Sequence, residues 1–255
     1  MRTVQRSRAR LGVFVPFTNT NLEPDLMMMC PADVSVHVTR LGGYDANEVP
    51  DSRQMAGLGA MNMDEPIRLL AGVEPDIVIY GCTSATMAHG RDFDAALSAQ
   101  IASEGNARTI TAAGALVHAL QALEAERIAF ASPYVPVLND QAIAFLQSCG
   151  IETVSRADVA GTLDNAGQGN MSPEEVFDLG LQADSKKAKA IVLSCTDMRA
   201  VEVIEALETE TGKPVVTSNQ AIMFQALSQL NLTPARSGFG QLFDMQNAAL
   251  RTRSE

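Results

Sequence analysis

The feature that most constrains the fold of this chain is a sequence pattern that occurs twice. In the first copy, an apolar run ends in a small residue, a cysteine and a hydroxyl residue, as PDIVIYGCT around Cys82. In the second copy, KAIVLSCT repeats this order around Cys195. Two further segments recur in the same order, LGVFVP as IAFASP and RTIT as PVVT. Three ordered matches predict two similar half-domains, each with one thiol at the end of a strand.

Short apolar runs alternate with stretches of helical periodicity along the chain. The runs predicted as strands are Leu11–Pro16, Val34–Thr39, Ile77–Gly81, Thr109–Ala112, Ile128–Ser132, Glu152–Arg156, Ile191–Ser194 and Val215–Ser218. The stretches predicted as helices are Asp51–Ala71, Asp92–Glu104, Ala113–Glu124, Val137–Cys149, Ser172–Ala183, Met198–Thr211 and Gln220–Leu230. Continuous apolar strands that alternate with helices are typical of buried parallel strands joined by right-handed crossovers.

The predicted fold class is therefore α/β, with two pseudo-symmetric half-domains that each hold a roughly four-stranded parallel sheet flanked by helices. We expect the first half to span residues 1–113 together with a returning C-terminal tail, 223–255. The second half is expected to span residues 114–222. Because ligands of open α/β sheets bind beyond the carboxyl ends of the strands, the active site is predicted in the cleft between the halves.

Composition and charge restrict the possible partners. The chain has 255 residues, of which 46% are hydrophobic and 19% charged, as expected of a globular protein with a substantial core. The formal net charge of -11 argues against nucleic acid as a partner. An acidic substrate remains possible if local donors such as backbone N–H groups and hydroxyls bind it. No apolar run is long enough to span a membrane, and the N-terminal region has no cleavage site of a signal peptide, so a cytoplasmic location is expected.

The sequence predicts no metal and no cofactor. Four cysteines in a chain of this length are not a disulfide framework, and neither they nor the three histidines have metal-ligand spacing. The glycines at Gly57 and Gly59 lack the third glycine and the preceding strand of a dinucleotide fingerprint, and there is no phosphate-binding loop. His89 is interpreted as mainly structural.

Cys82 and Cys195 are the candidate catalytic residues. A thiol between a strand end and a helix start lies near unpaired N–H donors and the positive end of the helix dipole, which are expected to lower its pKa. Iodoacetamide should then modify Cys82 or Cys195 first near neutral pH, and a small dicarboxylate should protect that thiol. A single cysteine in an alanine- and valine-rich chain is more often a residue that simply packs in the core. Cys30 and Cys149, which lie outside the repeated pattern, are interpreted in this way.

Polar residues that follow predicted strands or lie in loops are candidates for binding substrate. They are Thr18, Asn19, Thr83, Ser84, Tyr134, Asn165 and Thr196. With successive backbone amides, the hydroxyls after each cysteine can form a nest that binds a carboxylate. The alternatives remain open: these hydroxyls can be helix N-caps, the two asparagines can serve turn chemistry, and Tyr134 can simply cover the rim of the core.

The motifs VPFTN with Glu23, GCTS, SPY, DN, SCT and the closing GFG resemble those of the aspartate/glutamate racemase superfamily. They are more similar to its branch of maleate cis-trans isomerases and arylmalonate decarboxylases, over nearly the whole chain. The resemblance implies that the thiolate matching Cys82 adds to the substrate double bond and that the thiol matching Cys195 protonates the neighbouring carbon. It implies that residues like Asn19, Tyr134 and Asn165 hold the carboxylates, and it favours a homodimer.

The leading hypothesis is a cofactor-independent isomerase of a small carboxylate or dicarboxylate. The Thr-Ser after the first cysteine and the Thr-Asp-Met-Arg after the second depart from maleate isomerases and are nearer to racemase-like proteins linked to ectoine utilisation. Three alternatives therefore stay open. They are an amino-acid racemase of the aspartate or glutamate type, an arylmalonate-type decarboxylase, and a non-catalytic metabolite-binding protein. The presence of Cys82 argues against the decarboxylase, because arylmalonate decarboxylases keep only the second cysteine.

Overall fold

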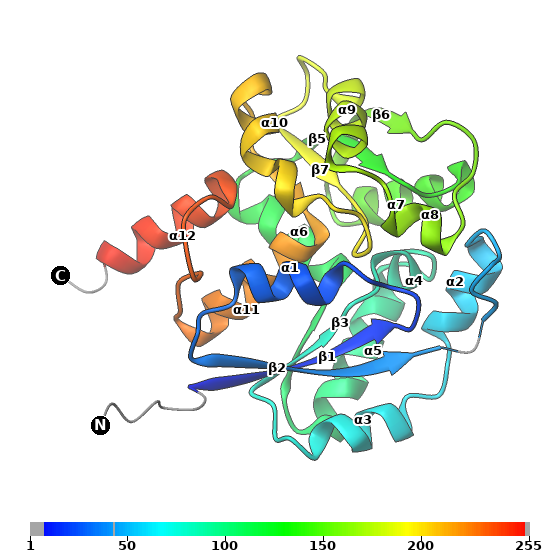
Figure 1. Cartoon of the computed structure of the whole chain (residues 1–255), viewed down its shortest axis with the longest axis vertical. Coiled ribbons are helices and arrows are strands. Elements are labelled where there is room, and N and C mark those ends of the chain that lie inside the picture. Colours follow the sequence, from blue (N-terminus) through cyan, green and yellow to red (C-terminus); the bar gives the residue numbers. More distant parts are fainter. Residues whose placement is uncertain (1–7, 43, 253–255) are drawn as a thin grey trace.

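Two parallel four-stranded sheets with the same strand order form the centre of the molecule. The structure, a computed structural model, describes residues 8–42 and 44–252 (Figure 1). The first sheet has the order β2-β1-β3-β4, and the second β6-β5-β7-β8. The strands are β1 (Ala9–Pro16), β2 (Val34–Leu41), β3 (Ile77–Tyr80), β4 (Arg108–Thr111), β5 (Arg127–Ser132), β6 (Glu152–Asp158), β7 (Ala190–Leu193) and β8 (Val215–Thr217). All eight predicted strands and the predicted duplication are confirmed.

Helices cover both sheets and fill the space between them. They are α1 (Leu22–Met29), α2 (Ser52–Gly59), α3 (Asp64–Ala71), α4 (Thr83–Met87), α5 (Arg91–Gly105), α6 (Ala112–Ala122), α7 (Pro136–Ser148), α8 (Asn165–Gly169), α9 (Pro173–Ala183), a 3₁₀ turn η1 (Val201–Val203), α10 (Ile204–Thr211), α11 (Ser218–Leu230) and α12 (Gly240–Thr252). Helices α6 and α11 pack against each other and against β4 and β8, so they join the two halves (Figure 1).

Two predicted helices differ from the structure. The helix predicted over 51–71 is two helices, since α2 ends at Gly59 and α3 begins at Asp64, where the backbone N–H donates to Asn62 Oδ1 at 2.8 Å. Glycine weakens a helix, and both Gly57 and Gly59 lie in the last turn of α2. The helix predicted from Met198 begins later, with η1 followed by α10.

The two thiol-bearing strands are buried, which explains their continuous apolar runs. All four residues of β3 and all four of β7 are buried. After β3 the chain needs glycine, because a Cβ on Gly81 would lie 2.4 Å from Leu22 Cδ2 and 2.7 Å from the carbonyl oxygen of Phe14. Gly81 therefore allows α1 and β1 to approach closely just before Cys82.

The C-terminal segment contacts both halves. The backbone N–H of Ala235 donates to the carbonyl of Met29 at the end of α1, at 3.0 Å. Beyond it, α12 packs against β8 and α10 of the second half. The division into residues 1–113 with 223–255 and residues 114–222 stays a prediction.

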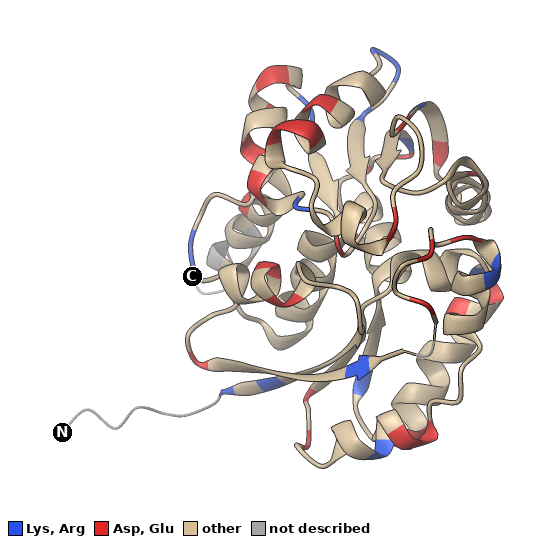
Figure 2. Ribbon diagram, turned by 45° about the vertical axis from the view of Figure 1, so that its right-hand side comes forward, with Lys and Arg blue, Asp and Glu red and all other residues tan. Residues whose placement is uncertain are grey.

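The described surface bears separate charges rather than a stripe. Lys and Arg occupy scattered positions along the ribbon, while Asp and Glu are more numerous on the outer helices (Figure 2). Among residues 8–42 and 44–252, no helix is long and apolar enough to cross a membrane.

Candidate active site

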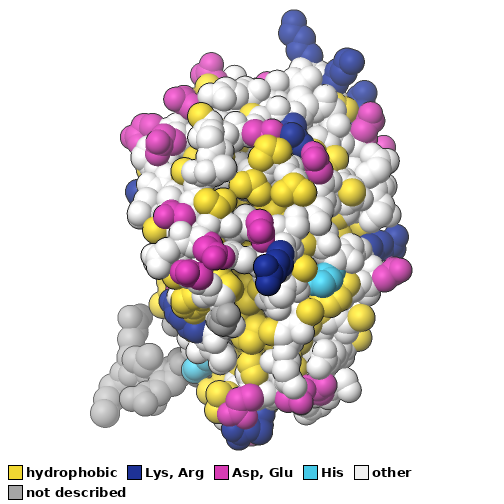
Figure 3. Space-filling view, turned by 90° about the vertical axis from the view of Figure 1, so that its right-hand side faces the viewer, with side chains coloured by type: hydrophobic (Ala, Val, Ile, Leu, Met, Phe, Trp, Pro, Cys, Tyr) yellow, Lys and Arg dark blue, Asp and Glu magenta, His cyan; other side chains and the backbone are white. Residues whose placement is uncertain are grey.

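A cavity lies where the carboxyl ends of β1, β3, β5 and β7 meet. Its empty volume is about 390 Å³, including the open space at its mouth. It is lined by Pro16, Thr18, Asn19, Tyr44, Pro50, Met55, Leu58, Cys82, Ser84, Tyr134, Asn165, Gln168, Cys195, Thr196 and Asp197. The thiols of the two halves thus share one cavity. On the face seen in Figure 3, hydrophobic side chains lie in several patches between scattered charged residues.

The cavity brings together all but one of the candidate residues. Thr83 is the exception: its side chain is fully buried, does not line the cavity, and donates to Ser218 Oγ at 3.0 Å. This hydrogen bond ties α4 to α11. Only the backbone of Thr83, in the first turn of α4, remains available to the nest that the sequence predicted.

Cys82 lies between the end of β3 and the start of α4. Backbone N–H groups of Ser84 and Ala85 donate to its sulfur, and Ser84 Oγ lies 3.8 Å from Cys82 Sγ. These contacts lower the pKa of the thiol, but its burial raises the pKa by more, so the net shift is upward. The prediction of a lowered pKa is therefore wrong for Cys82 in this structure.

Cys195 follows β7 in the equivalent position. The N–H of Asp197 donates to Cys195 Sγ at 3.3 Å. Burial, and then the nearby Asp197 carboxylate, raise the pKa of the Cys195 thiol to about 12. The prediction of a lowered pKa is also wrong here, because both cysteines are at most 6% exposed and none of the described residues lining the cavity is Lys or Arg. Burial thus favours the neutral form of both thiols.

Hydroxyl side chains line the cavity together with the two sulfurs. Ser84 Oγ lies 3.8 Å from Cys82 Sγ, and Ser84 and Cys195 are among the groups that act on the pKa of Tyr134. Burial raises the pKa of Tyr134 well above its usual value, so the phenol stays protonated. Ser84 Oγ also lies 3.0 Å from Met55 Sδ on α2.

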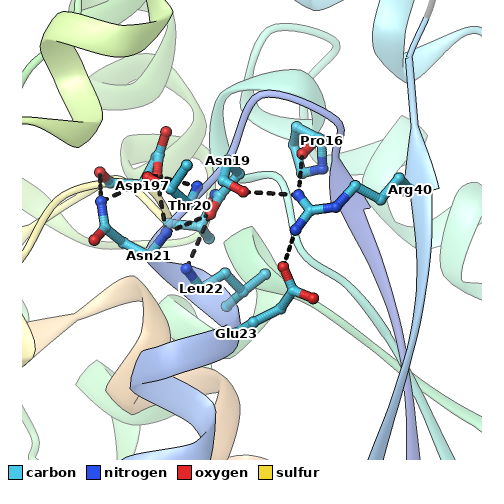
Figure 4. Close-up of polar contacts among 9 residues, drawn as sticks. Pro16, Asn19, Thr20, Asn21, Leu22, Glu23, Arg40 and Asp197 are labelled. Atoms are coloured by element: carbon cyan, nitrogen blue, oxygen red, sulfur yellow. Dashed lines mark hydrogen bonds and ion pairs between the residues drawn. The ribbon is translucent and has the colours of Figure 1, made fainter.

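Asn19 holds the loop between β1 and α1 against the second half. Its side-chain oxygen accepts the N–H groups of Asn21 at 3.1 Å and Leu22 at 2.9 Å, which are orphan donors at the start of α1 (Figure 4). Its Nδ2 donates to Thr196 Oγ1 at 3.1 Å, and Thr196 Oγ1 donates to the carbonyl of Gly81 at 3.0 Å. These bonds link the β1 loop to the segments that carry both cysteines.

Asp197 is a cavity-lining residue that the sequence analysis did not select. Its Oδ1 accepts the backbone N–H groups of Thr20 at 2.8 Å and Asn21 at 3.1 Å (Figure 4). Burial raises the pKa of this carboxyl to about 6 even though these hydrogen bonds oppose the shift. On the other side of the same loop, Arg40 donates to the carbonyl of Asn19 at 2.7 Å and pairs with Glu23. The signal in the sequence was the position of Asp197 directly after Cys195-Thr196.

Asn165 and Thr18 contact the segment that forms one wall of the cavity. Asn165 Nδ2 donates to the carbonyls of Ala46 at 3.3 Å and Glu48 at 3.2 Å. Thr18 Oγ1 lies 2.9 Å from the Tyr44 hydroxyl. Tyr44 and Pro50 also line the cavity and lie in the loop between β2 and α2. The sequence of this loop has no motif that would have identified them as site residues.

The remaining titratable side chains do not form a metal centre. Among the described residues, no group of three or more His, Cys, Asp or Glu side chains is arranged to hold a metal ion. His89 does not line the cavity; its Nε2 contacts the carbonyl of Ala56 at 2.7 Å and its ring stacks on Phe93. Both contacts agree with a structural role for His89.

Comparisons with known proteins point to one group of enzymes. The family model of arylmalonate decarboxylase matches residues 62–243. A maleate isomerase from Nocardia farcinica is 30% identical over 94% of this chain and 97% of that protein. The solved structure of the Nocardia farcinica maleate cis-trans isomerase bound to TRIS has a TM-score of 0.84 and 27% identity, covering 94% of this chain and 99% of that one. A cysteine-to-serine mutant of that enzyme, with a covalently bound succinylcysteine intermediate, has a TM-score of 0.83 and 26% identity, covering 92% and 98%.

Proposed function

We infer that this chain, which belongs to the arylmalonate decarboxylase family, is a cofactor-independent cis-trans isomerase of a small dicarboxylate such as maleate. The observation that carries this proposal is that Cys82 and Cys195, at equivalent positions of two sheets, line one small cavity. The succinylcysteine intermediate of the Nocardia farcinica enzyme supports it, because such an adduct forms when a cysteine sulfur adds to the double bond of maleate.

The proposed reaction needs only the two thiols. Cys82 reacts as its thiolate: its Sγ bonds to one carbon of the double bond while the Cys195 thiol gives its proton to the other, which leaves a single bond that can rotate and a thiolate at Cys195. Cys195 then removes a proton from the same carbon, the Cys82 sulfur leaves, and the trans dicarboxylate is released. Covalent and proton-transfer roles each contribute rate enhancements of about a hundredfold or more.

The carboxylates of the substrate are held by neutral donors in this proposal. Thr18, Asn19, Ser84, Tyr134, Asn165 and Thr196 supply hydroxyl or amide groups that line the cavity. Thr83 contributes only its backbone N–H, since its hydroxyl already bonds to Ser218. To bind a carboxylate, the amide of Asn165 must give up its bonds to Ala46 and Glu48, and the Thr196 hydroxyl its bond to Gly81.

Proton NMR of the purified protein in deuterated water separates this activity from the alternatives. With maleate, aspartate, glutamate and a methyl-arylmalonate as substrates, we expect conversion of maleate to fumarate. Exchange of the α-hydrogen of an amino acid would favour a racemase, and loss of carbon dioxide would favour a decarboxylase. No reaction with any of the four would favour a metabolite-binding protein.

Substitution of the cysteines tests their roles. Cys82→Ala and Cys195→Ala should each lower turnover by at least about a hundredfold. Cys30→Ala and Cys149→Ala are the controls, because neither side chain lines the cavity, and both should remain active. Full activity of Cys82→Ala would contradict the two-thiol mechanism and favour a decarboxylase-like reaction.

The proposal also includes a cytoplasmic location and a homodimer. A cytoplasmic location is tested by cell fractionation, in which the protein should appear with the cytosolic markers. A homodimer is tested by analytical ultracentrifugation, which should give twice the mass of one chain. A species of any other mass would contradict the dimer.

A further inference from the structure

We propose that Asp197 Oδ2 shares one proton with a carboxylate of the bound substrate, so that the dicarboxylate enters the cavity together with a proton from solvent. This inference rests on the proposed isomerase function and makes Asp197 the residue that selects the protonation state of the substrate. It concerns the substrate carboxylate on the side of Cys195, since the Asp197 N–H donates to Cys195 Sγ at 3.3 Å.

The two oxygens of the Asp197 carboxyl group differ in their contacts. Oδ1 accepts the backbone N–H groups of Thr20 at 2.8 Å and Asn21 at 3.1 Å, Asn21 Nδ2 at 3.1 Å and Thr20 Oγ1 at 3.4 Å (Figure 4). Within residues 8–42 and 44–252, no hydrogen bond reaches Oδ2. One carboxylate oxygen is therefore fully used by the protein, and the other is left for a donor on the substrate.

The position of Oδ2 makes it accessible to a substrate. Asp197 is only 8% exposed and lines the cavity, while Oδ2 itself is not enclosed by protein atoms. Gly169 leaves room beside it, because a Cβ at that residue would lie 3.1 Å from Oδ2. A buried carboxylate oxygen without a donor is costly, so a hydrogen bond from the substrate to Oδ2 is favoured.

The charges in the cavity explain why the shared group is a proton. No Lys or Arg is among the described residues that line it, so a dianion would lie beside a further carboxylate without a cation. Two carboxylates that share a buried site keep one proton between them, because ionisation of both places like charges close together. Burial also raises the pKa of Asp197 to about 6, so its carboxyl takes up a proton more readily than an exposed aspartate does.

The other groups around Asp197 do not supply a free cation. The charged and titratable side chains of the elements packed around it are Glu23 and Asp25 of α1, Arg40 of β2, Tyr44, Cys82, Cys195, Arg199 and Glu202. Both arginines of this set are already paired with its two glutamates. Helices α8 and α11 carry no titratable side chain. Neutralisation of the pair of carboxylates thus falls to the proton.

The proton balance closes over one turnover. One proton passes from solvent to the pair formed by Asp197 Oδ2 and a carboxylate oxygen of maleate when the substrate binds. It stays between these oxygens while the two thiols act, since no bond change of the isomerisation consumes it. When the trans dicarboxylate leaves, the two carboxylates separate and the proton returns to solvent.

Proton uptake on binding is the direct test. Succinate serves as the probe, because it is a dicarboxylate without a double bond and cannot be isomerised. Isothermal titration calorimetry of the wild-type protein at pH 8, in two buffers of different ionisation enthalpy, should show about one proton taken up per succinate bound. Asp197→Asn keeps the acceptor at Oδ1 and places an amide donor at the position of Oδ2, so it should take up none.

The same proton should govern the pH dependence of KM. In the wild-type protein, KM for maleate should rise about tenfold per pH unit above pH 7, because binding consumes one proton. In Asp197→Asn, KM should vary little between pH 7 and pH 9. Asp25→Asn is the matched control: Asp25 is a buried carboxyl that does not line the cavity, so this variant should keep the wild-type slope.

Absence of proton uptake with succinate in the wild-type protein would overturn the proposal, and this measurement does not depend on the folding of a variant. Equal pH dependence of KM in the wild type and Asp197→Asn would also overturn it. Tighter binding of aspartate than of succinate, without proton uptake, would do the same and make Oδ2 an acceptor for an ammonium group. Inactivity towards maleate, with one proton still taken up with succinate, would remove the isomerase function while supporting the shared proton.

Discussion

Cys82 and Cys195 occupy equivalent positions, yet their neighbours differ. The carboxylate of Asp197 adds to the burial that raises the pKa of Cys195 to about 12. No carboxylate contributes to the raised pKa of Cys82. Its sulfur accepts N–H groups from Ser84 and Ala85, which stabilise a thiolate. The difference favours Cys82 as the group that adds to the substrate and Cys195 as the group that holds a proton.

The order of alkylation should be opposite to the order expected from the sequence. Iodoacetamide should modify Cys149 before Cys82 or Cys195 at pH 7, because Cys149 is partly exposed and burial raises the pKa of the other two thiols. Labelling of Cys82 should increase from pH 7 to pH 9, and a small dicarboxylate should slow it. Peptide mass spectrometry measures each site separately. Faster modification of Cys82 than of Cys149 at pH 7 would show that the thiol is ionised despite its burial.

Asn19→Ala should lower both activity and stability. The side chain lines the cavity, and its oxygen also accepts two N–H groups at the start of α1. Loss of such a cap costs about 1 kcal/mol of unfolding free energy, which urea denaturation measures. Asn19→Asp keeps the acceptor but removes the Nδ2 donor to Thr196, so its loss of stability measures that second contact, and it should bind a dicarboxylate poorly. Unchanged stability of Asn19→Ala would mean that water replaces the cap.

At the scale of elements, the contact between α1 and α11 depends on pH. Asp25 on α1 accepts from Asn219 Nδ2 on α11 at 2.7 Å. Burial raises the pKa of Asp25 to about 7, with Glu202, Asp197 and Arg199 as the other charged groups that act on it. Because the folded protein holds a proton that the unfolded chain releases above pH 4, this contribution to stability is present below that pH and decreases as the pH rises through about 7.

The wild-type protein should therefore lose unfolding free energy between pH 5 and pH 8, on the order of 3 kcal/mol from this group. Asp25→Asn removes the titration while keeping an acceptor for Asn219, so its unfolding free energy should vary less over the same range. Urea denaturation at both pH values provides the comparison. Parallel pH dependence in the two proteins would exclude Asp25 as the source.

The strands were predictable because they are buried on both faces. A run such as that of β3 is apolar at every position, and its ends are marked by Pro75 before it and Gly81 after it. The short helices α1, α4 and α8 were not predicted, since five to eight residues give little periodicity. Their positions follow from tertiary contacts, such as the hydrogen bond between Thr83 and Ser218.

At the scale of the whole molecule, the duplication predicted how the site is assembled. Two sheets with the same strand order bring the equivalent ends of β3 and β7 to one cavity. The sequence could not predict the raised pKa values, because burial depends on how the halves close around the thiols. No sequence pattern indicated that Tyr44 would line the cavity, where its hydroxyl contacts Thr18.

Activity should survive prolonged treatment with EDTA and need no added nucleotide, flavin or pyridoxal phosphate. The described residues hold no cluster of metal ligands, and the sequence has no phosphate-binding glycine loop. Charge on the substrate is instead stabilised by oriented donors, each typically worth about 3–4 kcal/mol in the transition state. A loss of activity on chelation that a divalent ion restored would contradict this mechanism.

The most direct test of the two-thiol account is to trap the covalent intermediate. Cys195→Ser should still allow Cys82 to add to maleate, with the proton at the neighbouring carbon supplied by water. The serine hydroxyl then stays neutral and is too weak a base to remove that proton, so the adduct should accumulate. Mass spectrometry of peptides from Cys195→Ser incubated with maleate should find a succinyl group on Cys82 and none on Cys30 or Cys149. The account would be contradicted if the wild-type protein isomerised maleate while Cys195→Ser carried no adduct at Cys82.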